Sequence, residues 1–269
     1  MKLNKLKMVT AAALLTLSAG AQAGIIDLFS TDQANLSDAT TGDGGLSSSV
    51  IGGLDILGGE RDLYVELLSR DAATPGATAD LGVAGGALTF SVDAIASGKG
   101  VVQWDGLDGS DALAYNLGGI DLTDGGDLSA FSVETLFSDL GYEFVIGAYT
   151  DADNWTEITF SATAVNAPTT SEIAFSGFNN AFLCGAVNPV PGVKSIVCGD
   201  GGTSHAAPVD FTNLGALQFI IDPLGGAVAV DLTLDSIRTV PEPSVLGLMG
   251  AGLLAGGLVG RARRKKNKA

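Results

Sequence analysis

The sequence predicts an all-β fold, an antiparallel two-layer β-sandwich of jelly-roll type, flanked by an N-terminal signal peptide and one C-terminal transmembrane helix. About nine short segments carry the apolar–polar alternation typical of strands. Turn-forming sequences, rich in the 38 glycines of the chain, separate them at near-regular spacing. Between the two terminal hydrophobic segments no apolar pattern has the length of a helix, which favours a sandwich over a mixed fold.

The first 23 residues are predicted to be a signal peptide. Three lysines precede a short apolar core at residues 8–17, and Ala21 and Ala23 form an A-x-A cleavage signal. This core is too short to span a bilayer, which needs about 20 apolar residues. We therefore expect the exported, mature chain to begin at Gly24; a buried N-terminal helix is the alternative.

Strands are expected first at 24–30 and then after the Gly58-Gly59 turn, where Leu63, Val65 and Leu67 alternate with more polar neighbours. Residues 87–94 and 100–106 should pair through a turn at 97–100. By composition, the expected loops are 40–49, 70–86 and 105–127.

The second half shows clearer strand patterns. A hairpin turn is expected at 222–226, before a strand in which Val228, Val230, Leu232 and Leu234 share one face. The strands expected in this half are 131–137, 142–150, 155–164, 171–178, 216–222 and 227–237.

The predicted ectodomain, residues 24–239, is strongly acidic. It holds 29 of the 30 Asp and Glu residues but only five of the 14 Lys and Arg residues, a formal charge of −24. Such a charge repels phosphate backbones, so nucleic acid is not an expected partner. The same charge could attract divalent cations.

Two cysteines, Cys184 and Cys198, are expected to form one disulfide, as suits an exported domain in an oxidising compartment. Closing a loop of this size would contribute about 3 kcal/mol. A zinc site is disfavoured because the chain has a single histidine and no second cysteine pair.

Clusters of aspartates offer a weaker indication of metal binding. Asp105, Asp108 and Asp111 are spaced by three, and a second acidic turn starts at Asp151. Counted from Asp151, the fifth position is Trp155, so the pattern of an EF-hand loop fails. We expect solvated turn aspartates and no metal or cofactor; structural calcium in a loop remains an open alternative.

No catalytic constellation stands out, and we expect a protein that is not an enzyme. Residues 202–208 resemble the serine-bearing segment of subtilisin-like proteases, but His205 adjoins Ser204, so no separate base could activate that serine. Carboxylate pairs for glycoside hydrolysis cannot be selected from sequence alone. Five aromatic residues could either fill the core or offer a sugar-stacking platform: Trp104, Tyr115, Tyr142, Tyr149 and Trp155.

The last 30 residues, 240–269, combine three pieces in a fixed order. A stiff Pro241-Glu242-Pro243 precedes an apolar segment, 245–260, expected to be a short transmembrane helix. A basic tail follows, which the positive-inside rule would keep in the cytoplasm. Its first cations are Arg261, Arg263 and Arg264.

This arrangement resembles the PEP-CTERM sorting signal of Gram-negative bacteria. The resemblance implies processing near Pro241, Glu242 and Pro243 by exosortase, a membrane-embedded cysteine protease or transpeptidase. It also implies transient anchoring in the inner membrane, followed by transfer to the cell surface or extracellular matrix, typically beside exopolysaccharide and biofilm. We therefore expect a non-enzymatic surface or matrix protein, the alternative being a lectin-like, carbohydrate-binding domain assisted by calcium.

Overall fold

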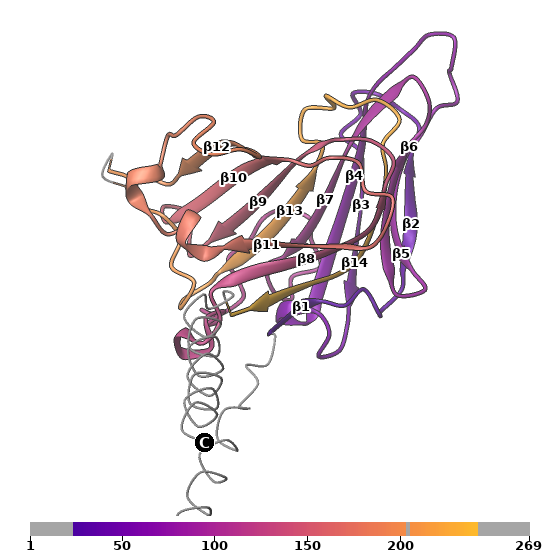
Figure 1. The fold of residues 1–269 in the computed structure, drawn as a ribbon. Coiled ribbons are helices and arrows are strands. Elements are labelled where there is room, and N and C mark those ends of the chain that lie inside the picture. The colour runs from indigo at the N-terminus through magenta and orange to yellow at the C-terminus, as the bar shows by residue number, and fades with distance from the viewer. Residues whose placement is uncertain (1–23, 203–204, 242–269) are drawn as a thin grey trace, which may run out of the picture.

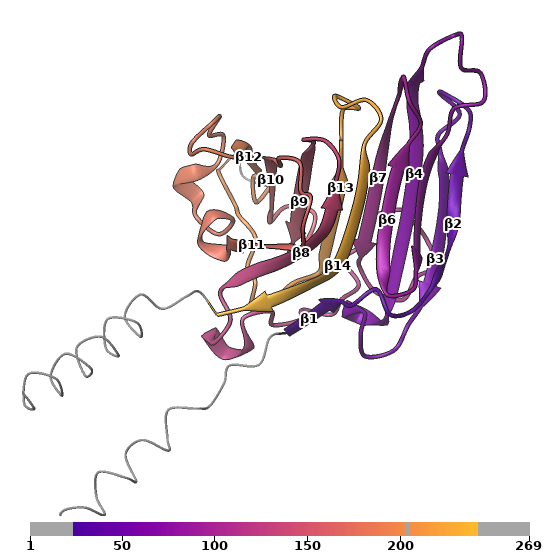
Figure 2. The same cartoon turned by 45° about the vertical axis from the view of Figure 1, so that its right-hand side comes forward.

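The computed structural model describes residues 24–202 and 205–241, which fold as two facing antiparallel sheets. Figures 1 and 2 show the two sheets packed face to face. The prediction of an all-β sandwich is confirmed. The expected signal peptide and the expected transmembrane helix at 245–260 lie outside the described residues.

The first sheet has seven strands, with β1 pairing beside β14 and the others in the order β11-β8-β14-β6-β5-β2. Their bounds are Gly24–Asp27 (β1), Gln33–Asp38 (β2), Ala79–Ala84 (β5), Ala87–Val92 (β6), Ala130–Ser138 (β8), Thr169–Ala174 (β11) and Asp231–Val240 (β14).

The second sheet also has seven strands, in the order β12-β10-β9-β13-β7-β4-β3. Their bounds are Leu46–Ile51 (β3), Glu60–Arg70 (β4), Ala96–Trp104 (β7), Glu143–Tyr149 (β9), Trp155–Ser161 (β10), Val193–Cys198 (β12) and Ala216–Ile221 (β13). Four 3₁₀ turns complete the described elements: Leu57–Gly59 (η1), Asp124–Gly126 (η2), Phe175–Gly177 (η3) and Ala181–Leu183 (η4).

One hydrophobic core fills the space between the sheets. The alternation predicted for β4 is confirmed: Leu63, Val65 and Leu67 are completely buried, and they meet residues such as Phe90 of β6 and Leu234 of β14 in the same cluster. Residues next to them in sequence point to the outer face, because side chains alternate along a strand.

Several local predictions are wrong because they relied on composition. Strand β3 begins inside the predicted loop 40–49, and β5 lies within the predicted loop 70–86. The segment 193–198 between the cysteines is strand β12. The three polar serines suit β3 because it lies at the edge of its sheet, and Gly82 suits β5 because its absent side chain admits Asn35 of β2.

Two predicted hairpins are also wrong, for a topological reason. The segment 97–100 lies inside β7, which pairs with β4 and β13, whereas β6 belongs to the opposite sheet. Residues 222–226 connect β13 to β14 across the two sheets instead of joining neighbours. The final strand starts at Asp231, leaving Val228 half exposed, and register shifts near Leu234 interrupt its alternation.

Candidate functional site

The C-terminal strand places the expected processing site at the boundary of the fold. In β14, Thr239 pairs with Gly24 of β1, and Val240 pairs with Ala130 of β8. The first and the last strand of the sandwich therefore lie side by side, as Figure 1 shows. Pro241 follows the last strand residue directly and is half-buried.

Other residues expected to direct export and sorting lie outside the described range: Ala21, Ala23, Glu242, Pro243, Arg261, Arg263 and Arg264. Gly24 is the first residue of β1. Among the described helices, none is long and apolar enough to cross a membrane.

A corner of the second sheet gathers three aspartates. Asp62 lies on the outer face of β4, Asp105 follows β7, and Asp108 is exposed in the loop that comes next. One ligand atom from each of the three lies within 4.8 Å of the others. The sequence pointed to Asp105 and Asp108 but paired them with Asp111, whereas the structure brings Asp62 from a strand over 40 residues away.

Burial shapes the electrostatics of this corner. Asp62 is 1% exposed and Asp105 is completely buried. Burial is the main cause that raises the pKa of Asp62 to about 7, opposed by the nearby Ser49 hydroxyl and reinforced by the charges of Asp105, Glu60 and Asp108. Burial also raises the pKa of Asp105, and the charge of Asp108 reinforces the shift. The hydrogen bonds from Ala114 and Gln103 and the neighbouring Asp62 carboxyl oppose it.

Beside the aspartates, a row of polar side chains crosses the outer face of the second sheet. Cross-strand pairing aligns Asp62 with Gln103 of β7, and Gln103 with Gln218 of β13. Gln218 Nε2 donates to Gln103 Oε1 at 2.9 Å. The row continues past Gly147 of β9 to Glu157 of β10. We call Asp62, Gln103, Gln218 and Glu157 the outer polar row.

Three aromatic residues lie at one end of this row. The ring of Tyr149 is 6.1 Å from that of Tyr115 and 6.1 Å from that of Trp155, measured between centroids. Tyr149 Oη donates to Glu157 Oε1 at 2.6 Å, so the trio and the row are connected. Tyr115 is 38% exposed, whereas Tyr149 is almost buried and its pKa is raised by burial and by the charge of Glu157.

The other two aromatics proposed for a platform belong elsewhere. Trp104 is completely buried, and its Nε1 donates to Asp27 Oδ2 at 2.9 Å, so it is a core residue. Tyr142 lines a groove on the opposite side of the second sheet, next to Phe144. A platform of five aromatics is therefore wrong, and a trio remains.

At the C-terminus the decisive finding comes from a family model. Residues 239–265 match the model of the PEP-CTERM protein-sorting motif. The chain is an exported protein with a PEP-CTERM sorting motif. This motif implies processing by exosortase and transient attachment to the membrane before release. The matched segment starts at Thr239, two residues before the described fold ends.

No curated protein matches the chain in sequence. In solved structures, a family 11 carbohydrate-binding module from Clostridium thermocellum, in complex with a mixed-linked β-1,3-1,4 tetrasaccharide, aligns with a TM-score of 0.39 and 13% identity, covering 82% of this chain and 98% of that one. The same module from a cellulosomal cellulase of that organism aligns with a TM-score of 0.38 and 14% identity, covering 83% and 96%. At this similarity neither match says anything about a ligand of this protein.

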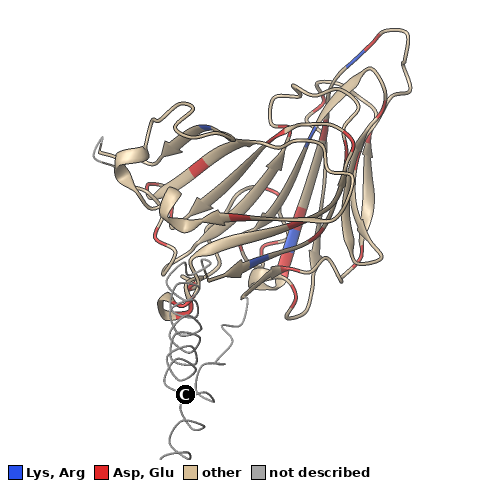
Figure 3. Cartoon of the chain, viewed as in Figure 1, with Lys and Arg blue, Asp and Glu red and all other residues tan. Residues whose placement is uncertain are grey.

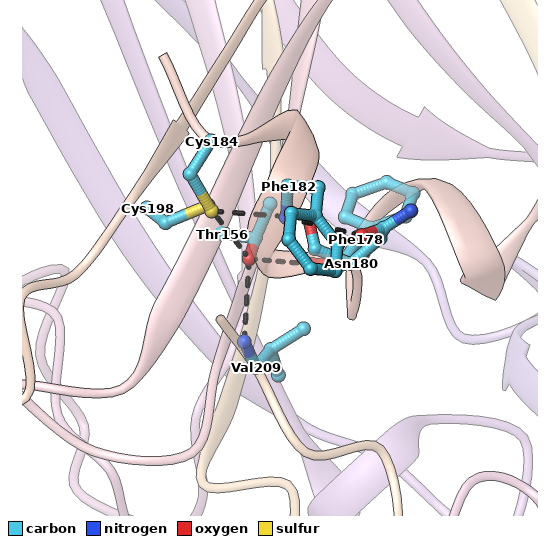
Figure 4. Close-up of a disulfide and its surroundings, with 7 residues drawn as sticks. All are labelled: Thr156, Phe178, Asn180, Phe182, Cys184, Cys198 and Val209. Atoms are coloured by element: carbon cyan, nitrogen blue, oxygen red, sulfur yellow. Dashed lines mark hydrogen bonds between the residues drawn. A yellow bond between two sulfur atoms is a disulfide. The ribbon is translucent and has the colours of Figure 1, made fainter. Parts of the chain in front are cut away.

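The predicted disulfide between Cys184 and Cys198 is confirmed, with Cα atoms 5.5 Å apart. It ties η4 to the end of β12, as Figure 4 shows. Beneath it, the buried Thr156 hydroxyl donates to the Phe178 carbonyl at 2.8 Å and accepts from Val209 N at 3.2 Å. The bridge and this threonine together hold three connecting segments against β10.

Next to the disulfide segment the two sheets separate into a groove of about 740 Å³. Strands β8 and β11 form one wall, and β9, β10 and β12 form the other. Its walls are mainly apolar and aromatic, which suits burial of an apolar group. Residues typical of the lining are Val133, Phe144, Phe160, Ile173, Val193 and Phe219.

Proposed function

We propose that the protein is a non-enzymatic component of the cell surface or extracellular matrix of a Gram-negative bacterium, delivered through its sorting motif and associated with exopolysaccharide in a biofilm. The observation that supports this most directly is the position of the motif. The last paired residue of β14 is Val240, and Pro241-Glu242-Pro243 follows at once. Exosortase can therefore act after the last strand without removing any strand pairing.

The strand that carries the motif is well anchored in the fold. β14 pairs with β8, with β6 and with β1, so it lies in the interior of its sheet. Processing beyond such a strand leaves the hydrophobic core unchanged. A β-sandwich released in this way would keep the stability it had while attached.

Replacement of Pro241, Glu242 and Pro243 by alanine tests the sorting proposal in the native host. We expect the variant to accumulate unprocessed in the membrane fraction, as the wild-type chain should in a strain without exosortase. An immunoblot against the ectodomain reads both size and location. Pro75→Ala, in a loop of the sandwich, is the control and should be processed normally. Unchanged processing and location of the triple variant would contradict the proposal.

The buried aspartate pair favours a role other than hydrolysis. A glycosidase places its two carboxyl groups on either side of a sugar that must reach them. Asp62 and Asp105 are 1% and 0% exposed, with the loop after β7 against them. A sugar ring could not contact both without displacement of this loop, which supports the non-enzymatic proposal.

Carbohydrate binding is a second candidate, favoured by the aromatic trio beside the outer polar row. The exposed Tyr115 and the half-buried Trp155 offer flat apolar faces. Gln218 and Glu157, both half-buried, provide amide and carboxylate groups for sugar hydroxyls. Apolar faces with a few polar groups beside them are typical of small-molecule sites.

A glycan array of the processed protein, with and without calcium, tests this second candidate. Tyr115→Ala should weaken binding about tenfold, or about 1.4 kcal/mol, because it removes the exposed stacking face. Phe182→Ala is the matched control, since Phe182 is 98% exposed and lies beside the disulfide instead. Absence of binding under both conditions, or an equal loss in both variants, would reject this candidate.

A further inference from the structure

We propose that Asp62, Asp105 and Asp108 form a binding site for a hard divalent cation of the calcium type, which attaches the loop after β7 to the outer face of the second sheet. Neither the sorting motif nor the sugar-binding candidate requires this site. The three carboxylates each present an oxygen within 4.8 Å of the others.

The strongest observation is the lack of hydrogen-bond partners for buried carboxylate oxygens in this cluster. Neither oxygen of Asp62 accepts a hydrogen bond of normal geometry, although the residue is 1% exposed and the Ser49 hydroxyl lies close enough to lower its pKa. Asp105 Oδ1, also buried, has none either. A buried carboxylate without a partner is costly, and proteins normally pair such groups or use them to bind a metal. Three buried oxygens without partners, in two carboxylates of one acidic cluster, therefore indicate a missing positive charge.

No side-chain cation of the described residues neutralises these acids. Arg61 is adjacent in sequence, but it points to the opposite face and pairs with Asp27 at 3.0 Å. Lys99, on the neighbouring β7, pairs with Glu66 at 3.0 Å. The groups that raise the pKa of Asp62 by their charge are all acids.

The second oxygen of Asp105 is already held in place. Its Oδ2 accepts from Gln103 Nε2 and from the Ala114 amide, both at 2.7 Å. These two bonds fix the orientation of the carboxyl group and leave Oδ1 without a hydrogen-bond partner. Such hydrogen bonds around a ligand are typical of metal sites, where they orient the ligand before binding.

Glu60 holds the loop without being a ligand in this cluster. Its carboxylate accepts from the Asp108 amide at 2.7 Å and from the Gly109 amide at 3.1 Å. These bonds fix the backbone that carries the Asp108 side chain. Asp108 itself is exposed, so water could complete the coordination from the solvent side.

The donor set selects the class of ion. Three carboxylates, with neither histidine nor cysteine among them, favour hard cations over zinc or copper. Calcium accepts six to eight oxygens in irregular geometry, whereas magnesium requires a near-ideal octahedron. A site assembled from a strand, a strand end and a loop fits the more adaptable ion.

The test is calcium titration of the full chain in detergent after treatment with a chelator, by calorimetry and thermal unfolding. We expect saturable binding of one calcium ion and a rise in Tm, with magnesium at least tenfold weaker. Asp62→Asn should weaken binding at least tenfold while it keeps the size of the side chain. Asp108→Asn should do the same without any change in the core, because its side chain is exposed.

Asp43→Asn, in the exposed loop before β3, is the matched control and should bind calcium like the wild type. Binding that all three variants retain would overturn the proposal, because the ion would then lie elsewhere on this acidic surface. Absence of both heat and thermal shift with calcium and with magnesium at about 10 mM would also overturn it, and would indicate a proton shared between Asp62 and Asp105 instead.

Discussion

Two buried aspartates on opposite sides of β4 show how differently this protein treats the same chemical group. Asp27 faces the core and contacts Arg61, whereas Asp62 lies on the outer face. Residues 61 and 62 are neighbours, and strand geometry sends their side chains to opposite faces. Both carboxyl groups are hidden from water, yet only the inner one is surrounded by donors.

The inner carboxylate is fully satisfied. Asp27 Oδ1 accepts from the Phe29 amide at 2.8 Å and from Arg61 Nη1 at 3.0 Å, and Oδ2 accepts from Trp104 Nε1 at 2.9 Å. Arg61 in turn donates to Gln33 Oε1 at 2.9 Å. Such a network is typical of a structural ion pair that specifies how segments meet. The outer carboxylate has no such set, and this difference is what marks it as a ligand.

The described chain carries many acidic side chains, and Asp62 differs from most of them. Figure 3 shows many acidic and few basic positions on the described chain, as the composition requires. Most acids can remain solvated at loops and turns. Asp62 cannot, because the sheet and the loop after β7 cover it.

The largest expected effect is that of Arg61→Ala, which would break the satisfied pair. It leaves Asp27 charged and buried without a counter-ion, and we expect the free energy of unfolding to fall by about 3–5 kcal/mol. Urea unfolding measures it. Arg70→Ala, at the far end of the same strand and near the surface, should cost less than about 1 kcal/mol. Equal losses of stability in the two variants would show that the buried Arg61–Asp27 pair matters no more than an arginine near the surface.

A smaller loss is expected from Trp104→Phe. The ring volume is largely kept, but Asp27 Oδ2 loses a donor at 2.9 Å. A hydrogen bond to a charged group is worth about 1.5–3 kcal/mol. Trp155→Phe, on the half-exposed outer surface, serves as the control in the same urea experiment and should change stability by less than about 1 kcal/mol. A Trp104 variant as stable as this control would show that the hydrogen bond from Nε1 to Asp27 contributes little to stability.

The smallest effect should have the opposite sign. In the presence of chelator at pH 7, Asp62→Asn should raise the free energy of unfolding by about 1 kcal/mol, because it removes a charge that burial and three neighbouring acids disfavour. Asp27→Asn should lower it. Thermal unfolding in chelator compares the pair directly, and a loss of stability in both would show that Asp62 has a structural partner.

The sequence predicted most strands of the second half because their alternation is regular. Strands β8, β9, β10 and β13 lie close to the expected ranges. It missed β2 and β3, which are rich in polar residues, and also β5 and β12, which are short and lie in segments with many glycines or prolines. Glycine and serine have weak local preferences for strands, so tertiary contacts decide such segments.

At the candidate sites the sequence identified some of the residues but not the residues that lie against them in the fold. Asp105 and Asp108 drew attention by their spacing, whereas Asp62 stood inside a strand. A signal was present, since three charged residues in a row, Glu60, Arg61 and Asp62, begin a strand that is otherwise well buried. The sequence could not show which groups these three charged residues contact. Those contacts depend on the register of β4 against β3 and β7.

By itself, the sequence determined the all-β class, the pairing of the only two cysteines and the sorting motif at the C-terminus. Each of these depends on local pattern or on composition. Tertiary structure decided which strands share a sheet, and thereby that Trp104 meets Asp27 while Asp62 meets Asp105. The physical reason is that antiparallel pairing joins residues far apart in the chain, and only this pairing determines which buried charges are neutralised and which remain to bind an ion.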